Sequence, residues 1–304
     1  MKQVEERYIS LLTDFGFKRI FGTAMNKDLL ICFLNSLFNG RQVVKDVSYL
    51  NPEHVGDVYT DRRAIFDVYC EGENGEKFIV EMQNAYQAYF KDRSLFYSTF
   101  PIREQAPKGN DWDFKLNHVY TVALLNFNMN EDAFDKEKIR HHVQLCDTAT
   151  HKIFYDKLEF IYVEIAKFNK TLGELETLYE KWLYALKNLY KLTQRPKELC
   201  DKVFDRLFEE AEIAKFTPQE VREYEASKKA YRDIKNSIDT AKNQGKEEGL
   251  AEGIEIGKKE GRKEGRIEAN TETAQRLLAM GLSAEQVAEA TQLPLDIIEK
   301  LSRS

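Results

Sequence analysis

All the aromatic residues of this 304-residue chain lie at or before Tyr231, which limits where a large core can form. The 19 phenylalanines, 15 tyrosines and two tryptophans are the side chains that bury the largest apolar areas on folding. The chain beyond Tyr231 must therefore be organised without an aromatic core. Charged residues make up 32% of the chain and hydrophobic residues 42%, a balance that is typical of globular proteins and excludes disorder throughout.

Charge and cysteine content narrow the class of protein. The net charge is -6, which argues against a protein that binds nucleic acid through its overall charge. Binding through a local basic surface is not excluded by the net charge. The four cysteines have no CxxC spacing, so we expect reduced core thiols; they are Cys32, Cys70, Cys146 and Cys200. No apolar stretch follows the first charges, and the longest apolar run, Leu29 to Phe38, is about half a membrane span. We therefore expect a cytoplasmic protein with no signal peptide and no membrane partner.

The periodicity of the apolar residues predicts both helices and strands. Over 27–38 the apolar positions recur three and four residues apart until Asn39 and Gly40 end the pattern, which predicts a helix. β-like runs cover 43–50, 64–70, 77–83, 118–125, 140–144 and 157–165, and further helical patterns cover 89–105, 175–192 and 197–210. This order predicts an α/β protein with a mixed β-sheet flanked by helices.

The residues from Ile65 to Gln83 predict a β-hairpin whose register follows from its apolar pattern. The apolar positions alternate in both strands: Phe66, Val68 and Cys70, then Phe78, Val80 and Met82. Both triplets reach the core only if the pairing is centred on Asn74, which requires a three-residue loop over 73–75. Gly75 then takes the left-handed position of that loop.

This register places two carboxylates opposite each other. Asp67 faces Glu81 across the ladder, and Gln83 lies two residues further along the same face. Facing carboxylates repel each other, so a structure that keeps them usually holds a cation between them or raises a pKa. Oxygen ligands suit Mg²⁺, or Mn²⁺, which leave room for a phosphate oxygen and an attacking water. The alternative is a solvated strand face, because such faces often carry Asp and Glu.

Six glycines stand at a four-residue period in the segment that we assign to 237–270. They are Gly245, Gly249, Gly253, Gly257, Gly261 and Gly265. Each costs roughly 1 kcal/mol in a helix, so a stable helix needs a compensating contact. We expect either a fraying, charged helical linker or a helix that packs closely on a second copy of the chain, which would make a homo-oligomer.

The end of the chain, 271–304, predicts a small hairpin of two short helices. Ser283 and Gln286 fit a capping box at the start of the first. The second carries Asp296 and Glu299 against one lysine, which is poor chemistry for a DNA-reading helix. A packing or oligomerisation unit is the preferred interpretation.

Several motifs together point to a known family. TDFGFKRIFG, FDVYC, FIVEMQNAYQAYFKDRSLFYS and the glycine-rich charged tail resemble the Rpn family of recombination-promoting nucleases, also described as transposases of the PD-(D/E)XK nuclease superfamily. The resemblance covers roughly residues 5 to 270. It implies a PD-(D/E)XK, restriction-endonuclease-like domain over 1–236, with a helical C-terminal extension. In this superfamily an acidic residue on one strand and an E-x-K on the next bind Mg²⁺ for phosphodiester hydrolysis.

The resemblance also implies roles for individual residues. Asp67 and Glu81 would be the metal ligands, with the carbonyl of Met82 as a possible third. Gln83 stands where the superfamily has lysine. A glutamine can orient a water or touch a phosphate, but it cannot neutralise charge or act as a general base as lysine can.

Three further residues are candidates for substrate binding through the resemblance. Asp14 and Lys18 lie in the D-x-x-F-K segment, although a helix-start Asp and a surface Lys would look the same. Arg93 lies in the YF-x-D-R pattern and would either clamp a phosphate or form a salt bridge with Glu81 or Asp67.

These expectations favour a magnesium-dependent DNA endonuclease, a hydrolase that promotes recombination. The rival is a catalytically weak DNA-binding or oligomeric scaffold protein with a nuclease-like fold, which the acidic net charge and the missing lysine favour. RNA remains open as a substrate.

Overall fold

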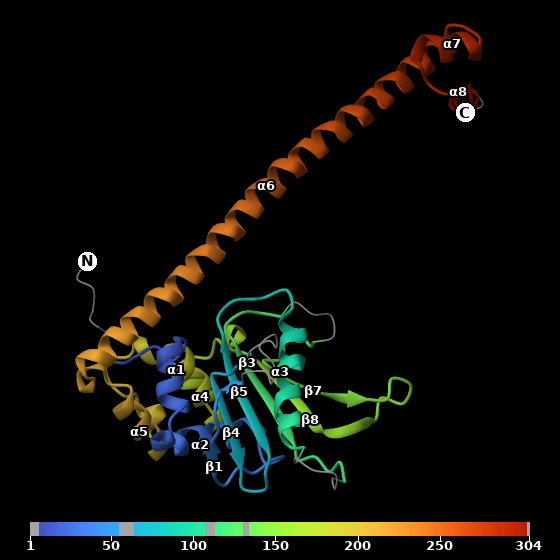
Figure 1. The fold of residues 1–304 in the computed structure, drawn as a ribbon. Helices are drawn as coiled ribbons and strands as arrows, with labels where there is room; N and C mark the ends of the chain where they lie inside the picture. Colours follow the sequence, from blue (N-terminus) through green and yellow to red (C-terminus); the bar gives the residue numbers. More distant parts are fainter. Residues whose placement is uncertain (1–5, 55–63, 107–112, 130–133, 303–304) are drawn as a thin grey trace. The chain divides into compact units, whose positions relative to one another are not determined.

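The computed structural model describes residues 6–54, 64–106, 113–129 and 134–302 (Figure 1). The chain forms two compact units, Met1–Asn236 and Ser237–Ser304. No helix among the described residues combines the length and the apolar character needed to cross a lipid bilayer.

A six-stranded mixed sheet is the centre of the first unit. Its strand order is β1-β4-β5-β6-β8-β7, in which β5, β6 and β8 run parallel and the other pairs are antiparallel. The bounds are β1 Val47–Tyr49, β4 Val68–Gly72, β5 Lys77–Gln83, β6 Val119–Leu125, β7 Arg140–Cys146 and β8 Ile153–Glu164. A separate two-stranded sheet pairs β2 (Glu53–His54) with β3 (Ala64–Ile65). The predicted mixed α/β class is confirmed.

Helices cover both faces of the sheet (Figure 1). One face packs against α1 (Asp14–Phe21), α2 (Lys27–Phe38), α4 (Leu178–Asn188) and α5 (Lys202–Glu210) in the main apolar core. The other face packs against α3 (Phe90–Glu104). Consecutive residues of β5 serve the two faces, since Val80 joins the main core and Ile79 packs with Phe100 of α3.

The β4–β5 hairpin has the predicted register. Val68 pairs with Val80, and the N–H of Gly72 donates to the carbonyl of Glu76 at 2.8 Å, which leaves a three-residue loop. Gly75 in this loop has a φ of 81°, the left-handed conformation that glycine adopts without a steric cost.

The predicted face of Phe66 is wrong. Phe66 packs with Tyr69 and Tyr97 on the α3 face, not with Val68 in the main core. The chain between β3 and β4 is not strand, and the N–H of Phe66 donates to the carbonyl of Pro52 at 3.0 Å. The side-chain alternation is therefore interrupted before β4 begins.

Two other expectations need correction. β1 begins only at Val47, although the β-like run starts at residue 43. The backbone of Val44 is hydrogen-bonded to the side chain of Asn35 in α2 instead of to a strand: its N–H donates to Oδ1 and its carbonyl accepts from Nδ2, each at 2.8 Å. Of the cysteines expected in the core, Cys146 and Cys200 are exposed, although all four are free thiols.

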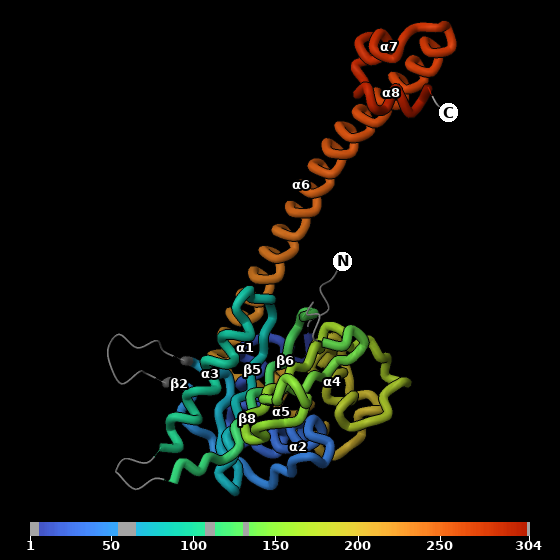
Figure 2. The backbone as a smooth tube through the Cα atoms, turned by 90° about the vertical axis from the view of Figure 1, so that its right-hand side faces the viewer, coloured from blue at the N-terminus to red at the C-terminus, as the bar shows by residue number. Residues whose placement is uncertain are grey.

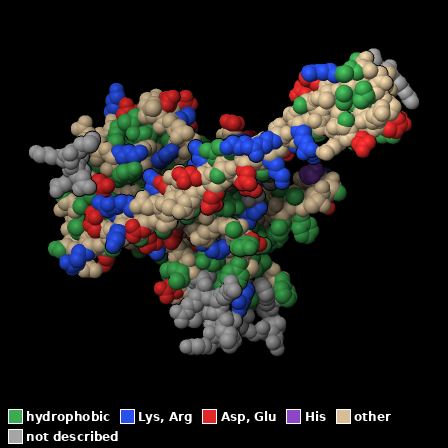
Figure 3. Space-filling model, turned by 90° about the horizontal axis from the view of Figure 1, so that it is seen from above, with side chains coloured by type: hydrophobic (Ala, Val, Ile, Leu, Met, Phe, Trp, Pro, Cys, Tyr) green, Lys and Arg blue, Asp and Glu red, His purple; other side chains and the backbone are tan. Residues whose placement is uncertain are grey.

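The remaining chain is helical. α6 is one continuous helix, Pro218–Ala279 (Figure 2), and α7 (Ala284–Thr291) and α8 (Leu295–Ser302) follow it. Basic and acidic side chains are interspersed along α6 (Figure 3). Within the second unit, a small apolar cluster joins the end of α6 to both short helices; it consists of Ala274, Val287, Leu293 and Ile298. The capping box of Ser283 and Gln286 is present.

Candidate active site

Asp67 and Glu81 come together where the β4–β5 ladder ends. Asp67 immediately precedes β4, and its Oδ2 accepts a hydrogen bond from the N–H of Met82 at 2.9 Å. Glu81 lies in β5 with 5% of its surface exposed, whereas the side chain of Asp67 is 23% exposed. The pair therefore has one buried member and one that reaches solvent.

The backbone of Met82 contributes to the same place. In an extended strand the N–H and the C=O of one residue point to the same edge. Since the N–H of Met82 is directed to Asp67, its carbonyl oxygen is directed to that edge as well. Two carboxylates and one carbonyl are thus grouped at the end of the ladder.

Burial and mutual repulsion disfavour ionisation of this pair. Burial, followed by the charge of Asp67, raises the pKa of Glu81 to about 8, and Arg93 and Gln83 offset only part of this effect. Burial also raises the pKa of Asp67, against the hydrogen bond from Met82 and the charge of Lys18. A bound cation would remove this penalty.

Lys18 reaches the pair from α1. Its Nζ lies 3.9 Å from Oδ1 of Asp67 and 2.7 Å from Oδ1 of Asp14, one helical turn earlier. Both residues of the D-x-x-F-K segment are therefore next to the carboxylate pair, and Lys18 is more than an isolated surface residue.

The position of α1 depends on close contacts at its start. Thr13 caps the helix by accepting from the N–H of Gly16 at 3.1 Å. A Cβ at Gly16 would lie 2.1 Å from the carbonyl oxygen of Ser10, so only glycine fits there. Ser227 of α6 accepts a hydrogen bond from the N–H of Phe15 at 3.0 Å and ties α1 to the first part of α6.

Arg93 of α3 approaches the pair from the other face of the sheet. Its Nη2 lies 3.9 Å from Oε2 of Glu81, and its Nη1 donates to Oε1 of Gln87 at 2.5 Å. The Nε and Nη2 atoms are buried and make no hydrogen bond to any residue that the structure describes. The ion pair with Glu81, one of the two roles considered for Arg93, is therefore present, and Nε and Nη2 can still donate hydrogen bonds to a further acceptor. Gln83 donates to Oε2 of Glu81 at 3.3 Å.

Sequence reasoning missed a pocket of about 610 Å³ beside Arg93. Tyr89, Phe96 and Tyr97 line it together with Arg93. The spacing of 89, 93 and 96 along a helix was the available signal, because residues four and seven apart lie on one face.

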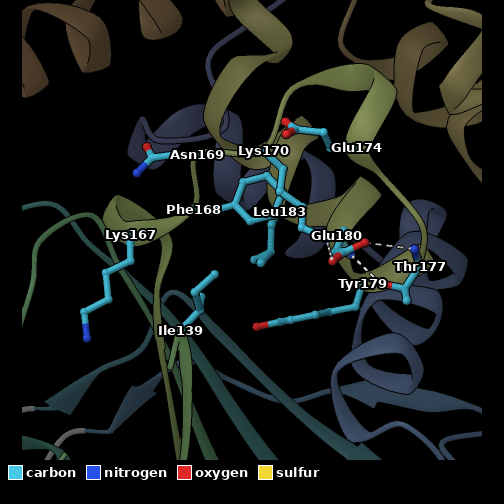
Figure 4. A pocket seen from close by; sticks show the side chains of 10 residues that line it. All are labelled: Ile139, Lys167, Phe168, Asn169, Lys170, Glu174, Thr177, Tyr179, Glu180 and Leu183. Carbon is cyan, nitrogen blue, oxygen red and sulfur yellow. Dashed lines mark hydrogen bonds and ion pairs between the residues drawn. The ribbon is translucent and has the colours of Figure 1, made fainter. Parts of the chain in front are cut away.

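A second pocket, of about 430 Å³, lies in the same unit between the turn after β8 and the start of α4 (Figure 4). Its acidic groups are engaged locally. The carboxylate of Glu180 accepts from the N–H of Thr177 and pairs with Lys170 at 2.5 Å, and that of Glu174 accepts from the N–H of Thr171. Figure 4 shows the Tyr179 hydroxyl directed toward Ile139. This pocket has no facing carboxylates comparable to Asp67 and Glu81.

The donor set at the ladder end fits a hard divalent cation. The described residues contain no cluster of three or more His, Cys, Asp or Glu side chains placed to hold a metal. Asp67, Glu81 and the Met82 carbonyl would supply oxygen only. Mg²⁺ suits this set, because it commonly takes one or two carboxylates and retains water in its other positions.

Comparison with known proteins agrees with this geometry. Residues 11–241 match the family described as PD-(D/E)XK nuclease family transposase. No curated protein and no solved structure matches the chain. The matched region contains the whole six-stranded sheet, the helices on both of its faces and the carboxylate pair. The chain therefore belongs to the PD-(D/E)XK nuclease family transposases and has their nuclease-like α/β fold.

Proposed function

We propose that the protein is a metal-dependent DNA endonuclease that hydrolyses phosphodiester bonds and promotes recombination. The observation that carries the proposal is the position of Asp67 beside the buried Glu81 at the end of the hairpin ladder, in a chain of a nuclease family. Burying two facing carboxylates costs stability, and a cation with a catalytic task accounts for their presence.

Asp67 and Glu81 would hold Mg²⁺, or Mn²⁺, with the Met82 carbonyl as the third protein ligand. The metal ion would activate a water and neutralise charge on the scissile phosphate. Gln83, held beside Glu81 by its amide, would orient the water or the substrate.

Two basic side chains, Lys18 and Arg93, would supply the positive charge that Gln83 lacks. Lys18, 3.9 Å from Asp67, is placed to neutralise a phosphate oxygen from the α1 side, and Asp14 holds its ammonium group in position. Arg93 offers Nε and Nη2 to a phosphate from the α3 side. Both side chains would bind phosphate groups of the substrate, in addition to stabilising the ionised carboxylates.

The test is cleavage of supercoiled plasmid by the purified full chain with Mg²⁺, Mn²⁺, Ca²⁺ or EDTA. Asp67→Asn and Glu81→Gln keep the side-chain size and remove the charge, and Glu73→Gln in the exposed hairpin loop is the matched control. We expect cleavage by the wild type and the control and none by the site variants or in EDTA. Equal nicking by all four proteins would indicate a contaminant and count against the proposal.

The rival proposal is a catalytically weak DNA-binding or scaffold protein. Gln83 in the place of the superfamily lysine and the net charge of -6 favour it. If no protein nicks plasmid or RNA while the wild type and Asp67→Asn bind DNA equally, the scaffold function replaces the nuclease.

The glycine-periodic part of α6 supports the proposal that two copies of the chain associate through it. No atom lies within 4 Å of a Cβ built at any of the six glycines, so nothing in the described part of the chain uses the space they leave. We also place the protein in the cytoplasm, where its four free cysteines would stay reduced.

A further inference from the structure

We propose that the pocket at the start of α3 binds an unpaired nucleobase beside the scissile phosphate, so that single-stranded or frayed DNA is the preferred substrate. This inference rests on the proposed nuclease function. It assigns the substrate class of the same site.

The pocket has the surfaces that stacking on a base requires. Within its volume of about 610 Å³, Tyr89 is 78% exposed and Phe96 is 43% exposed. Apolar side chains of this size normally lie in the core, so the exposure of two aromatic rings in one hollow marks a binding surface. Tyr97 lines the same pocket from the next turn of α3.

Arg93 connects the pocket to the carboxylate pair. It lines the pocket, and its guanidinium lies 5.7 Å from the centre of the Tyr97 ring and 3.9 Å from Glu81. Its Nε and Nη2 atoms, which make no hydrogen bond to any described residue, are suited to a phosphate oxygen. A phosphate bound there would place its own base at the aromatic side chains.

Polar groups at the pocket match the edge of a base. Asp92 and Gln87 line it and bring a carboxylate and an amide. Carboxylates accept hydrogen bonds from exocyclic amino groups of bases, and glutamine both donates and accepts.

A base that is paired in a duplex cannot enter such a pocket. A base in a duplex is stacked on both faces, and it must leave the helix before a side chain can stack on it. Stacking on aromatic side chains is the usual way in which proteins hold single strands, and it tolerates any base. An apolar peptide would also fill the hollow, but it would not use the unfilled donors of Arg93.

The first experiment measures binding without turnover. The full chain is titrated in EDTA into a fluorescein-labelled single strand, or into the same strand annealed to its complement, and the anisotropy gives Kd. We expect tighter binding to the single strand. Tyr89→Ala and Phe96→Ala should weaken single-strand binding by roughly 5- to 150-fold each, the range for one lost base stack.

The controls separate stacking from general loss of aromatic surface. Tyr89→Phe keeps the ring and should bind like the wild type. Phe154→Ala removes an aromatic side chain that is 82% exposed and outside the pocket, and it should leave Kd unchanged. A strand with 2-aminopurine reports the stack directly, because its emission changes when the base stacks on the wild type and should not change with Phe96→Ala.

The outcomes distinguish this inference from the nuclease function. If plasmid cleavage requires Asp67 and Glu81 but duplex binds as tightly as single strand, or Phe96→Ala binds like the wild type, the pocket assignment is wrong and the nuclease stands. If single strands bind through Phe96 while no protein cleaves, the pocket stands on a scaffold protein.

Discussion

At the scale of the residue, Glu81 shows how a site can oppose the stability of its own fold. The same burial that shapes the site raises the pKa of Glu81 to about 8, from an ordinary value of 4.5. A carboxyl group with a raised pKa stabilises the fold fully only at low pH, and this contribution is lost as pH rises toward 8. The metal-free protein should therefore become less stable between about pH 4.5 and pH 8.

Replacement of Glu81 by glutamine should remove this penalty. We expect Glu81→Gln to raise the free energy of unfolding of the metal-free protein by on the order of 1–3 kcal/mol at pH 7, and the gain should vanish below about pH 4.5. Urea unfolding in EDTA across this pH range measures it. Mg²⁺ should raise the Tm of the wild type and leave that of the variant unchanged. Parallel pH profiles for the two proteins would contradict the assigned pKa.

At the scale of the element, α1 delivers Lys18 because its first turn sits against the segment before it. The Ser10 carbonyl that would clash with a Cβ at Gly16 already accepts from the Thr13 hydroxyl at 2.7 Å. This bond fixes the oxygen, so it cannot move aside for a side chain.

We expect Gly16→Ala to destabilise the protein by about 1–3 kcal/mol, the usual cost of overpacking, and to reduce cleavage by moving α1. Gly173→Ala is the control, because a Cβ at Gly173 would meet nothing within 4 Å. Its free energy of unfolding should stay within about 0.5 kcal/mol of the wild type. Equal stability of the two variants would refute the packing argument.

At the scale of the whole molecule, α6 is the element whose sequence is hardest to explain if the protein is a monomer. Its six glycines carry an intrinsic cost of roughly 1 kcal/mol each in a helix. Exposed apolar side chains lie among them, including Leu250 at 64% and Ile254 at 50% exposure. Contact with a second copy would offset both.

Analytical ultracentrifugation of the full chain tests this association. We expect a dimer for the wild type, and a monomer for Gly253→Leu, whose side chain would hold two helices apart. Ala251→Leu lies on the opposite side of the helix and should remain a dimer. A monomeric wild type at the highest soluble concentration would rule out the second copy as the compensating contact.

The sequence by itself determined the parts of this protein that depend on short-range rules. The bounds of α2 and β5, and those of β6 to within one residue, follow from apolar periodicity, and the register of the β4–β5 hairpin follows from strand alternation and a three-residue loop. These features were predictable because each involves residues close together in the chain.

Only the tertiary structure decided what surrounds the carboxylate pair. Lys18 and Arg93 come from helices on opposite faces of the sheet, and no local pattern specifies their distance to Asp67 or Glu81. Such contacts depend on how the helices pack on the sheet. The same packing buries Glu81 and so raises its pKa, and it places Arg93 between Glu81 and the aromatic pocket.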